Sequence, residues 1–77
     1  MKLSELKKNN LARIKAIDIK DKALKIHLME MGLVNNTQVK VIRYSKNKEI
    51  ITIYFRNYEL SLSKDILDNI VVVVWLF

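Results

Sequence analysis

The chain has no cysteine, no proline and a single glycine among its 77 residues. The lack of cysteine excludes disulfides and thiolate metal sites. The longest apolar run, residues 70–77, is far shorter than the roughly 18 residues that cross a bilayer. The first eleven residues are polar and lysine-rich, without the apolar core of a signal peptide. We therefore expect a cytoplasmic protein held together by packing alone.

Length and composition predict a single domain spanning residues 1–77. Apolar residues make up 51% of the chain, which favours a packed core over disorder. The formal net charge of +6 could serve nucleic acid, an anionic membrane face or an acidic protein partner. A solvated surface is the simpler interpretation, because no block of five or more like charges occurs.

Alternating apolar and polar residues, or β-branched runs, recur along the chain and predict strands. The expected strands cover residues 12–17, 39–44, 50–55, 58–62 and 70–76. Polar turns separate them, and Ser63 can cap one helical turn at residues 64–69. The pattern indicates a mainly β protein with one or two short helices, arranged as a partly open barrel of about five strands.

A helical period begins at residue 23, after Asp21 as a candidate N-cap. Its apolar residues lie at i, i+4 and i+7 and share one face: Leu24, Leu28 and Met31. The single glycine, Gly32, follows at the position where helices often end with φ > 0. Leu33 can then contact the last turn, as in a Schellman ending. We expect these five residues to have structural roles.

The order and spacing of several short motifs resemble the FeoA family, small cytoplasmic proteins of bacterial ferrous-iron uptake. The matching segments are LeuSerGluLeu at 3–6, AlaArgIle at 12–14, Leu24-x-x-x-Leu28-x-x-Met31-Gly32-Leu33, Thr37-x-Val39-x-Val41, Tyr58-x-Leu60-x-Leu62 and Ile70-Val71-Val72. The chain departs from the family where Asn35-Asn36 replace a usual Pro-Gly, and where Ile26 replaces a commonly polar or basic residue. Asn can adopt the same turn geometry.

The resemblance implies a small SH3-like β-barrel that acts with the membrane transporter FeoB, which carries a cytosolic GTPase domain. The expected role is accessory or regulatory and works by protein–protein interaction, at the inner face of the membrane through the partner. The same fold forms the C-terminal domain of repressors similar to the diphtheria-toxin repressor. Their winged-helix segment is absent here, so we expect the stand-alone form.

The side chains do not suggest an enzyme. One histidine, no cysteine and scattered serines make no catalytic triad, and no P-loop motif is present. His27, Glu30 and Met31 would lie near one another on a helix. Ferrous iron typically needs three or more suitable ligands, and Met31 belongs to the apolar face. We expect no catalytic residue, metal site, cofactor or small-molecule substrate.

The alternative function is that of a small basic SH3-like nucleic-acid-binding protein. Four aromatic residues could stack on bases: Tyr44, Tyr54, Phe55 and Tyr58. Aromatic residues in the strands of a small barrel more often fill the core or form cross-strand pairs. No basic–aromatic motif resembles an RNP sequence. We therefore expect a protein partner rather than nucleic acid.

A candidate partner-binding surface lies on the predicted helix. Ile26 is about 200° around the helix from Leu24 and should be exposed. Lys22, Lys25 and Met29 flank it, which makes an apolar spot in a basic setting. A solitary exposed isoleucine usually has no function, so this assignment depends on its neighbours.

The C-terminal segment offers a second candidate surface. Val71–Val74 is β-branched at every position, with no polar residue on either side of the strand. The valines that do not face the core must therefore either pack under another element or be exposed to solvent. The segment Leu3–Leu6 or the helix could cover them. Alternatively, the strand with Trp75 and Phe77 could dock on a partner or pair with a second copy, giving a homo-oligomer.

Overall fold

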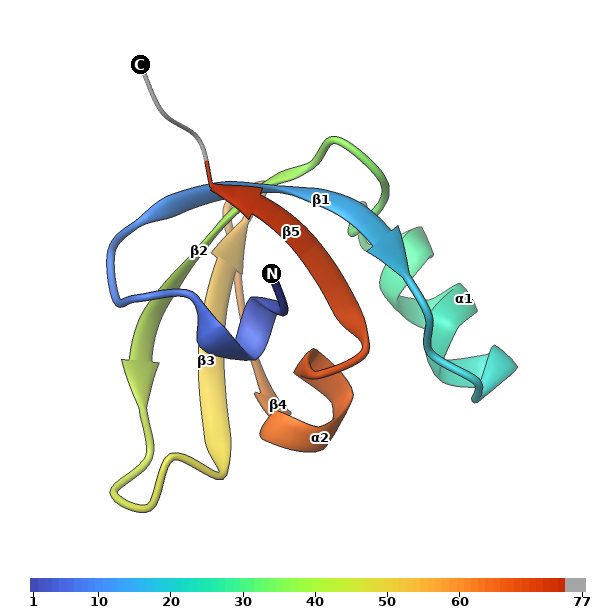
Figure 1. The fold of residues 1–77 in the computed structure, drawn as a ribbon. Coiled ribbons are helices and arrows are strands. Elements are labelled where there is room, and N and C mark those ends of the chain that lie inside the picture. The colour runs from blue at the N-terminus through green and yellow to red at the C-terminus, as the bar shows by residue number, and fades with distance from the viewer. Residues whose placement is uncertain (75–77) are drawn as a thin grey trace.

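The computed structural model describes residues 1–74 and shows one antiparallel five-stranded sheet with short helical segments (Figure 1). The elements are η1 (Leu3–Glu5), β1 (Leu11–Ile17), α1 (Lys22–Glu30), β2 (Gln38–Tyr44), β3 (Ile50–Phe55), β4 (Tyr58–Ser63), α2 (Lys64–Leu67) and β5 (Ile70–Val74). The strand order is β4-β3-β2-β1-β5. The mainly β expectation is confirmed. Within the described residues, no helix has the length and apolarity that a membrane crossing requires.

The curled sheet is not closed, because its two edge strands, β4 and β5, do not pair. Two short helices lie between these edges: η1 contacts β5 and α2, and α2 contacts β4. They contribute Leu3 and Leu67 to the core, and both side chains are fully buried. The Ser4 hydroxyl donates a hydrogen bond to Asp68 at the end of α2. The two helices thus cover the core between β4 and β5, where no strand pairing closes the sheet.

The core forms inside the curled sheet, where inward side chains alternate with outward ones. In β1, Ala12 and Ile14 are buried as expected, whereas Ala16 is only half-buried. The pairing of β1 with β5 shifts register between Ile14 and Ala16, and that of β2 with β3 shifts between Val41 and Arg43. Such irregularities bend a strand and increase its twist, which lets a short sheet curl.

Helix α1 begins and ends as its sequence predicts. The Asp21 carboxylate accepts a hydrogen bond of 3.2 Å from the Leu24 amide. At the other end, the Leu33 amide donates to the Leu28 carbonyl and the Gly32 amide donates to Met29, both at 2.9 Å. Gly32 has φ of +98°. These are the two hydrogen bonds of a Schellman ending.

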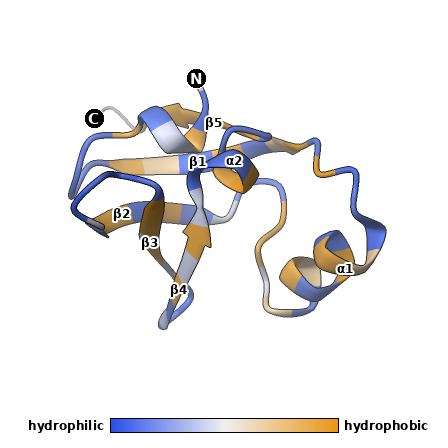
Figure 2. Ribbon diagram, turned by 90° about the horizontal axis from the view of Figure 1, so that it is seen from below, coloured by the Kyte–Doolittle hydropathy of each residue, from blue (hydrophilic) through white to orange (hydrophobic). Residues whose placement is uncertain are grey.

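Helix α1 lies beside the sheet rather than over it, as Figures 1 and 2 show from two directions. Of its predicted apolar face only Leu28 is buried, while Leu24 and Met31 are half-buried. Leu33 follows the helix and is fully buried in the main core. The helix is therefore attached mainly through its C-terminal end.

Tight turns elsewhere use residues with positive φ. Asn36 has φ of 73°, and Arg56 and Asn57 have φ of 48° and 69° between β3 and β4. Positive φ at both central residues is the requirement of a type I′ hairpin, whose twist matches that of the strands. Ser63 occupies the N-cap position of α2, but its side chain makes no capping hydrogen bond.

The uniformly β-branched strand β5 is covered unevenly. Ile70 and Val72 face the core and are buried. Val71 is half-buried and forms an isolated bridge with Lys2, so the N-terminal segment flanks this edge. Val73 is 53% exposed. Trp75 and Phe77 lie outside the described residues.

Candidate protein-docking surface on helix α1

The expected partner-binding residues of α1 share one side of the helix. Lys22, Lys25, Ile26 and Met29 are spaced i, i+3, i+4 and i+7, so they form one stripe, which we call the outer stripe. Ile26 is 57% exposed and Met29 is 48% exposed, whereas Leu28 is buried on the opposite side. The predicted exposure of Ile26 is confirmed. The outer stripe therefore presents two large apolar side chains to solvent.

A groove of about 530 Å³ continues the outer stripe toward the sheet. Its lining comes from Lys25 and Met29 of α1, the end of β1 with Ala16 and Ile17, and Val34 of the following loop. Val34 is 37% exposed. The helical periodicity of α1 could not identify Ala16, Ile17 and Val34 as part of this surface, because these residues come from other elements of the chain.

The loop that carries Val34 is fixed by several hydrogen bonds. The Thr37 hydroxyl donates to the Gly32 carbonyl at 2.8 Å and accepts from the Val34 amide at 3.1 Å. The Ile14 amide donates to Thr37 at 3.0 Å, and the Asn36 amide donates to Ile14 at 2.7 Å. The groove is therefore preorganised, which lowers the entropic cost of binding a partner.

The outer stripe itself carries two lysines and no carboxylate. Within residues 1–74, Lys22 and Lys25 form no ion pair. Asp18 also lines the groove. An apolar strip flanked by unpaired lysines suits a protein surface that combines apolar and acidic side chains, since complementary charge speeds association and orients the partner.

The residues considered as metal ligands differ in exposure. His27 and Glu30 are exposed on α1, and Met31 is half-buried against the core. Over residues 1–74, no group of three or more His, Cys, Asp or Glu side chains could hold a metal ion.

The four aromatic residues considered for base stacking have separate structural roles. Phe55 is buried, and its ring lies 6.2 Å from that of its cross-strand partner Tyr58. Tyr44 donates a hydrogen bond of 2.7 Å to the Leu6 carbonyl. Tyr54 donates one of 2.9 Å to Asn57, and the Lys40 ammonium lies 5.6 Å from its ring centre. Of these four residues, Tyr58 alone is exposed.

Comparisons with known proteins agree on one family. Residues 1–74 match the family model described as FeoA domain. The chain is similar to the solution structure of FeoA protein from Chlorobium tepidum, with 28% identity and a TM-score of 0.92 over 99% of this chain and 71% of that one. It is also similar to iron(II) transport protein A from Clostridium thermocellum, with 30% identity and a TM-score of 0.86 over 96% of this chain and 45% of that one.

A third solved structure shows the same fold at lower identity. It is FeoA from Stenotrophomonas maltophilia complexed with zinc, described as an SH3 domain protein possibly acting as a bacterial ferrous iron transport activating factor. Identity is 21% and the TM-score 0.82, over 95% of this chain and 89% of that one. The fold is thus SH3-like. A search of curated proteins gives no match.

Proposed function

The chain belongs to the FeoA family, which is linked to ferrous iron transport, and from this premise we propose that it docks on the cytosolic part of a FeoB-type transporter. It acts there as an accessory or regulatory protein, without catalysis of its own. Its place is the cytoplasm, at the inner face of the membrane when the transporter is bound. The observation that carries this proposal is the exposed outer stripe of α1 with its adjoining groove.

Docking explains why Ile26 and Met29 are exposed together. Large apolar side chains that leave water on binding supply much of the affinity at an interface. Lys22 and Lys25 flank these two side chains and would meet acidic groups of the partner. Because α1 lies beside the sheet, a partner can reach the stripe and the groove together.

A direct experiment is co-purification with a tagged FeoB-type transporter from the organism that encodes the chain. The proposal predicts that the two proteins elute together, and that the cytosolic part of the transporter is sufficient for this. Separate elution under conditions that keep both proteins folded would contradict it.

The nucleic-acid alternative is tested alongside. A salt-dependent mobility shift on generic RNA, without transporter binding, would favour that alternative, because phosphate contacts weaken as salt rises. The burial of Phe55, the hydrogen bond of the Tyr44 hydroxyl and the lysine over the Tyr54 ring count against base stacking by these residues.

Self-association is a further part of the proposal. Strand β5 is a sheet edge that the N-terminal segment flanks at Val71 and Val72, and Val73 is exposed. In the sequence, the apolar residues 75–77 follow this strand. An apolar edge favours pairing with another chain. We propose that copies of the chain associate through this edge at moderate concentration.

A further inference from the structure

Strand β4 has one open edge. It pairs with β3 on one side, and within residues 1–74 no strand pairs with its other side. The opposite edge of the sheet, β5, is partly occupied, because the Val72 amide donates to the Met1 carbonyl at 2.8 Å and the Met1 nitrogen donates to the Val72 carbonyl at 3.1 Å. Of the two sheet edges, β4 is therefore the one with an open backbone.

The β3–β4 hairpin determines which backbone groups of β4 lie on the open edge. Phe55 pairs with Tyr58 across the two-residue turn, so the N–H and C=O of Tyr58 point to β3. Successive residues of an antiparallel strand direct these groups to opposite sides. The residues of β4 whose N–H and C=O point away from β3 are therefore Glu59, Ser61 and Ser63. Within residues 1–74 these groups form no backbone hydrogen bond outside the strand ladder.

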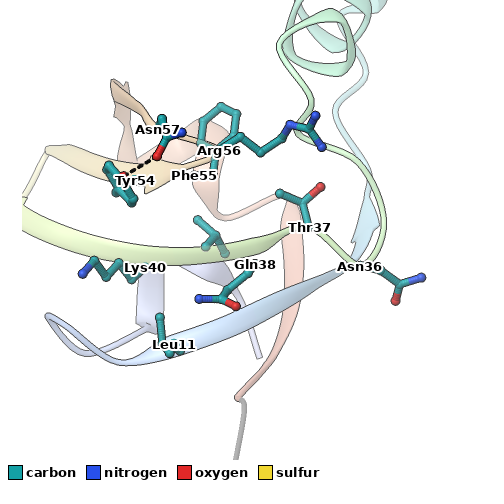
Figure 3. Close-up of a pocket in the computed structure, with 10 residues that line it drawn as sticks. Leu11, Asn36, Thr37, Gln38, Lys40, Tyr54, Phe55, Arg56 and Asn57 are labelled. Atoms are coloured by element: carbon teal, nitrogen blue, oxygen red, sulfur yellow. Dashed lines mark hydrogen bonds between the residues drawn. The ribbon is translucent and has the colours of Figure 1, made fainter.

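Side-chain contacts hold β4 in place against β3. The Tyr54 hydroxyl donates a hydrogen bond of 2.9 Å to Asn57 in the turn (Figure 3). Farther along the hairpin, the hydroxyl oxygens of Thr52 and Ser61 lie 2.7 Å apart. The open edge is thus ordered before anything binds to it, which lowers the entropic cost of adding a strand.

Strand β4 lacks the residues that often keep an edge strand from pairing. None of its six residues is Lys, Arg or Pro. Its one charged residue, Glu59, is already paired with Arg43 at 3.2 Å. On the other face of the strand, Tyr58 is 51% exposed, and Leu60 and Leu62 are only half-buried. A strand that brings apolar side chains to this face would cover them.

Two copies of β4 complement each other in one antiparallel register, with Ser61 opposite Ser61 of the second copy. Glu59 then faces Ser63 of the second copy, so every outward residue of both strands has a partner and no like charges meet. Leu60 faces Leu62 of the second copy on the apolar face. Any other antiparallel register leaves at least one outward residue of each strand unpaired. The sequence of β4 therefore favours a second β4 as the added strand.

We propose that two copies of the chain form a twofold-symmetric dimer by pairing their β4 edges around Ser61, so that the two sheets continue into one. Such an interface uses the same surface of both copies, and association through it stops at two. This contact is separate from the association through β5 and from the outer stripe of α1, and it does not depend on the transporter.

Single cysteines test this register directly, because the chain has no cysteine of its own. The two Ser61 Cα atoms would lie about 5.5 Å apart, which is within the range of a disulfide. Oxidation of Ser61→Cys should therefore give a covalent dimer. Ser63→Cys is the matched control, because the two copies of residue 63 would lie at least about 13 Å apart along the strands. A mixture of Glu59→Cys and Ser63→Cys chains should form the mixed disulfide, since these positions face each other.

Lysine substitutions test the contact without a covalent link. Ser61→Lys places two positive charges directly opposite each other and should weaken dimerisation, measured by sedimentation equilibrium, at least about fivefold. Ser63→Lys places each lysine opposite Glu59 of the second copy and should keep or raise the affinity. Ser61→Ala loses the hydrogen bond to Thr52 without adding charge, and should dimerise as the unaltered chain does.

Several results would overturn the proposal. These are a Ser61→Cys chain that stays monomeric on oxidation at high concentration, equal cross-linking of Ser61→Cys and Ser63→Cys, or no mixed disulfide between Glu59→Cys and Ser63→Cys. Equal weakening by the two lysine substitutions would overturn it as well. Removal of residues 75–77 tests the β5 contact and Ile26→Glu tests transporter docking, so the three proposals fail separately.

Discussion

Replacing Gly32 should destabilise the domain through two separable effects. Its φ of +98° lies in the region that residues with a β-carbon rarely adopt. A β-carbon at Gly32 would also come within 2.4 Å of Cδ and 2.6 Å of Nε of Arg56. The left-handed backbone costs about 1–2 kcal/mol for an L-residue. We expect Gly32→Ala to lose at least this much stability, and Gly32→Val to lose more, because its branched side chain is bulkier.

The contact with Arg56 can be isolated by a double-mutant cycle. Arg56 is exposed and its side chain is flexible, so part of the clash can be relieved by movement. Truncation by Arg56→Ala removes the atoms that the new β-carbon would meet. Gly32→Ala should therefore cost less in the Arg56→Ala background, leaving the backbone term of about 1–2 kcal/mol.

Urea denaturation of the four proteins measures these free energies, and thermal unfolding gives a second reading. For a domain of this size, 1 kcal/mol corresponds to about 4–8 °C in Tm. An unchanged Tm for Gly32→Val would refute the Schellman ending as the reason for this glycine. An equal cost in both backgrounds would show that Arg56 moves away freely.

Three further predictions concern metal, assembly and pH. Anaerobic calorimetry should detect no specific Fe²⁺ binding, and stoichiometric micromolar binding that His27→Ala abolishes would contradict this. Removing Trp75 to Phe77 should shift oligomers toward monomer in light scattering without unfolding the barrel. A full-length chain that stays monomeric at high concentration would contradict this, and so would a truncated chain that unfolds. Hydrogen bonds from Ser4 and then Lys64 lower the pKa of Asp68 below its ordinary 3.8. A carboxyl group whose pKa is lower in the folded state stabilises the fold at pH values above its unfolded pKa. The Tm of the unaltered chain should therefore exceed that of Asp68→Asn there, and this difference should vanish as pH falls through the folded pKa. A Tm difference that stays constant with pH would refute this.

Local sequence rules predicted the features that depend on a few neighbouring residues. Asp21 caps α1 and Gly32 ends it with positive φ. The strands begin and end within one residue of their expected bounds, apart from the expected end of the last strand at residue 76, which lies outside the described residues. The exposure of Ile26 also follows from helical geometry alone. In each case the cause lies within one turn of a helix or one hairpin, so one stretch of sequence contains it.

Features that depend on distant segments could not be predicted. Nothing local indicates that α1 lies beside the sheet, and so Leu24 and Met31 are less buried than their periodicity suggests. A pocket of about 460 Å³ joins Leu11 of β1, Lys40 of β2 and Arg56 of the β3–β4 turn. The position of Arg56 against Gly32 likewise results from tertiary packing, since the two residues are far apart in sequence.

The central claim, docking through the outer stripe of α1, is tested most directly by comparing Ile26→Glu with Ile50→Glu. Both change an exposed isoleucine to glutamate, and Ile50 is 46% exposed at the start of β3, outside the stripe. Binding of each variant to the purified cytosolic part of the FeoB-type transporter is measured by calorimetry. Burial of an isoleucine contributes about 1.5–3 kcal/mol, so Ile26→Glu should weaken binding about tenfold or more, while Ile50→Glu binds as the unaltered chain does. Unchanged affinity for a folded Ile26→Glu variant would contradict the claim.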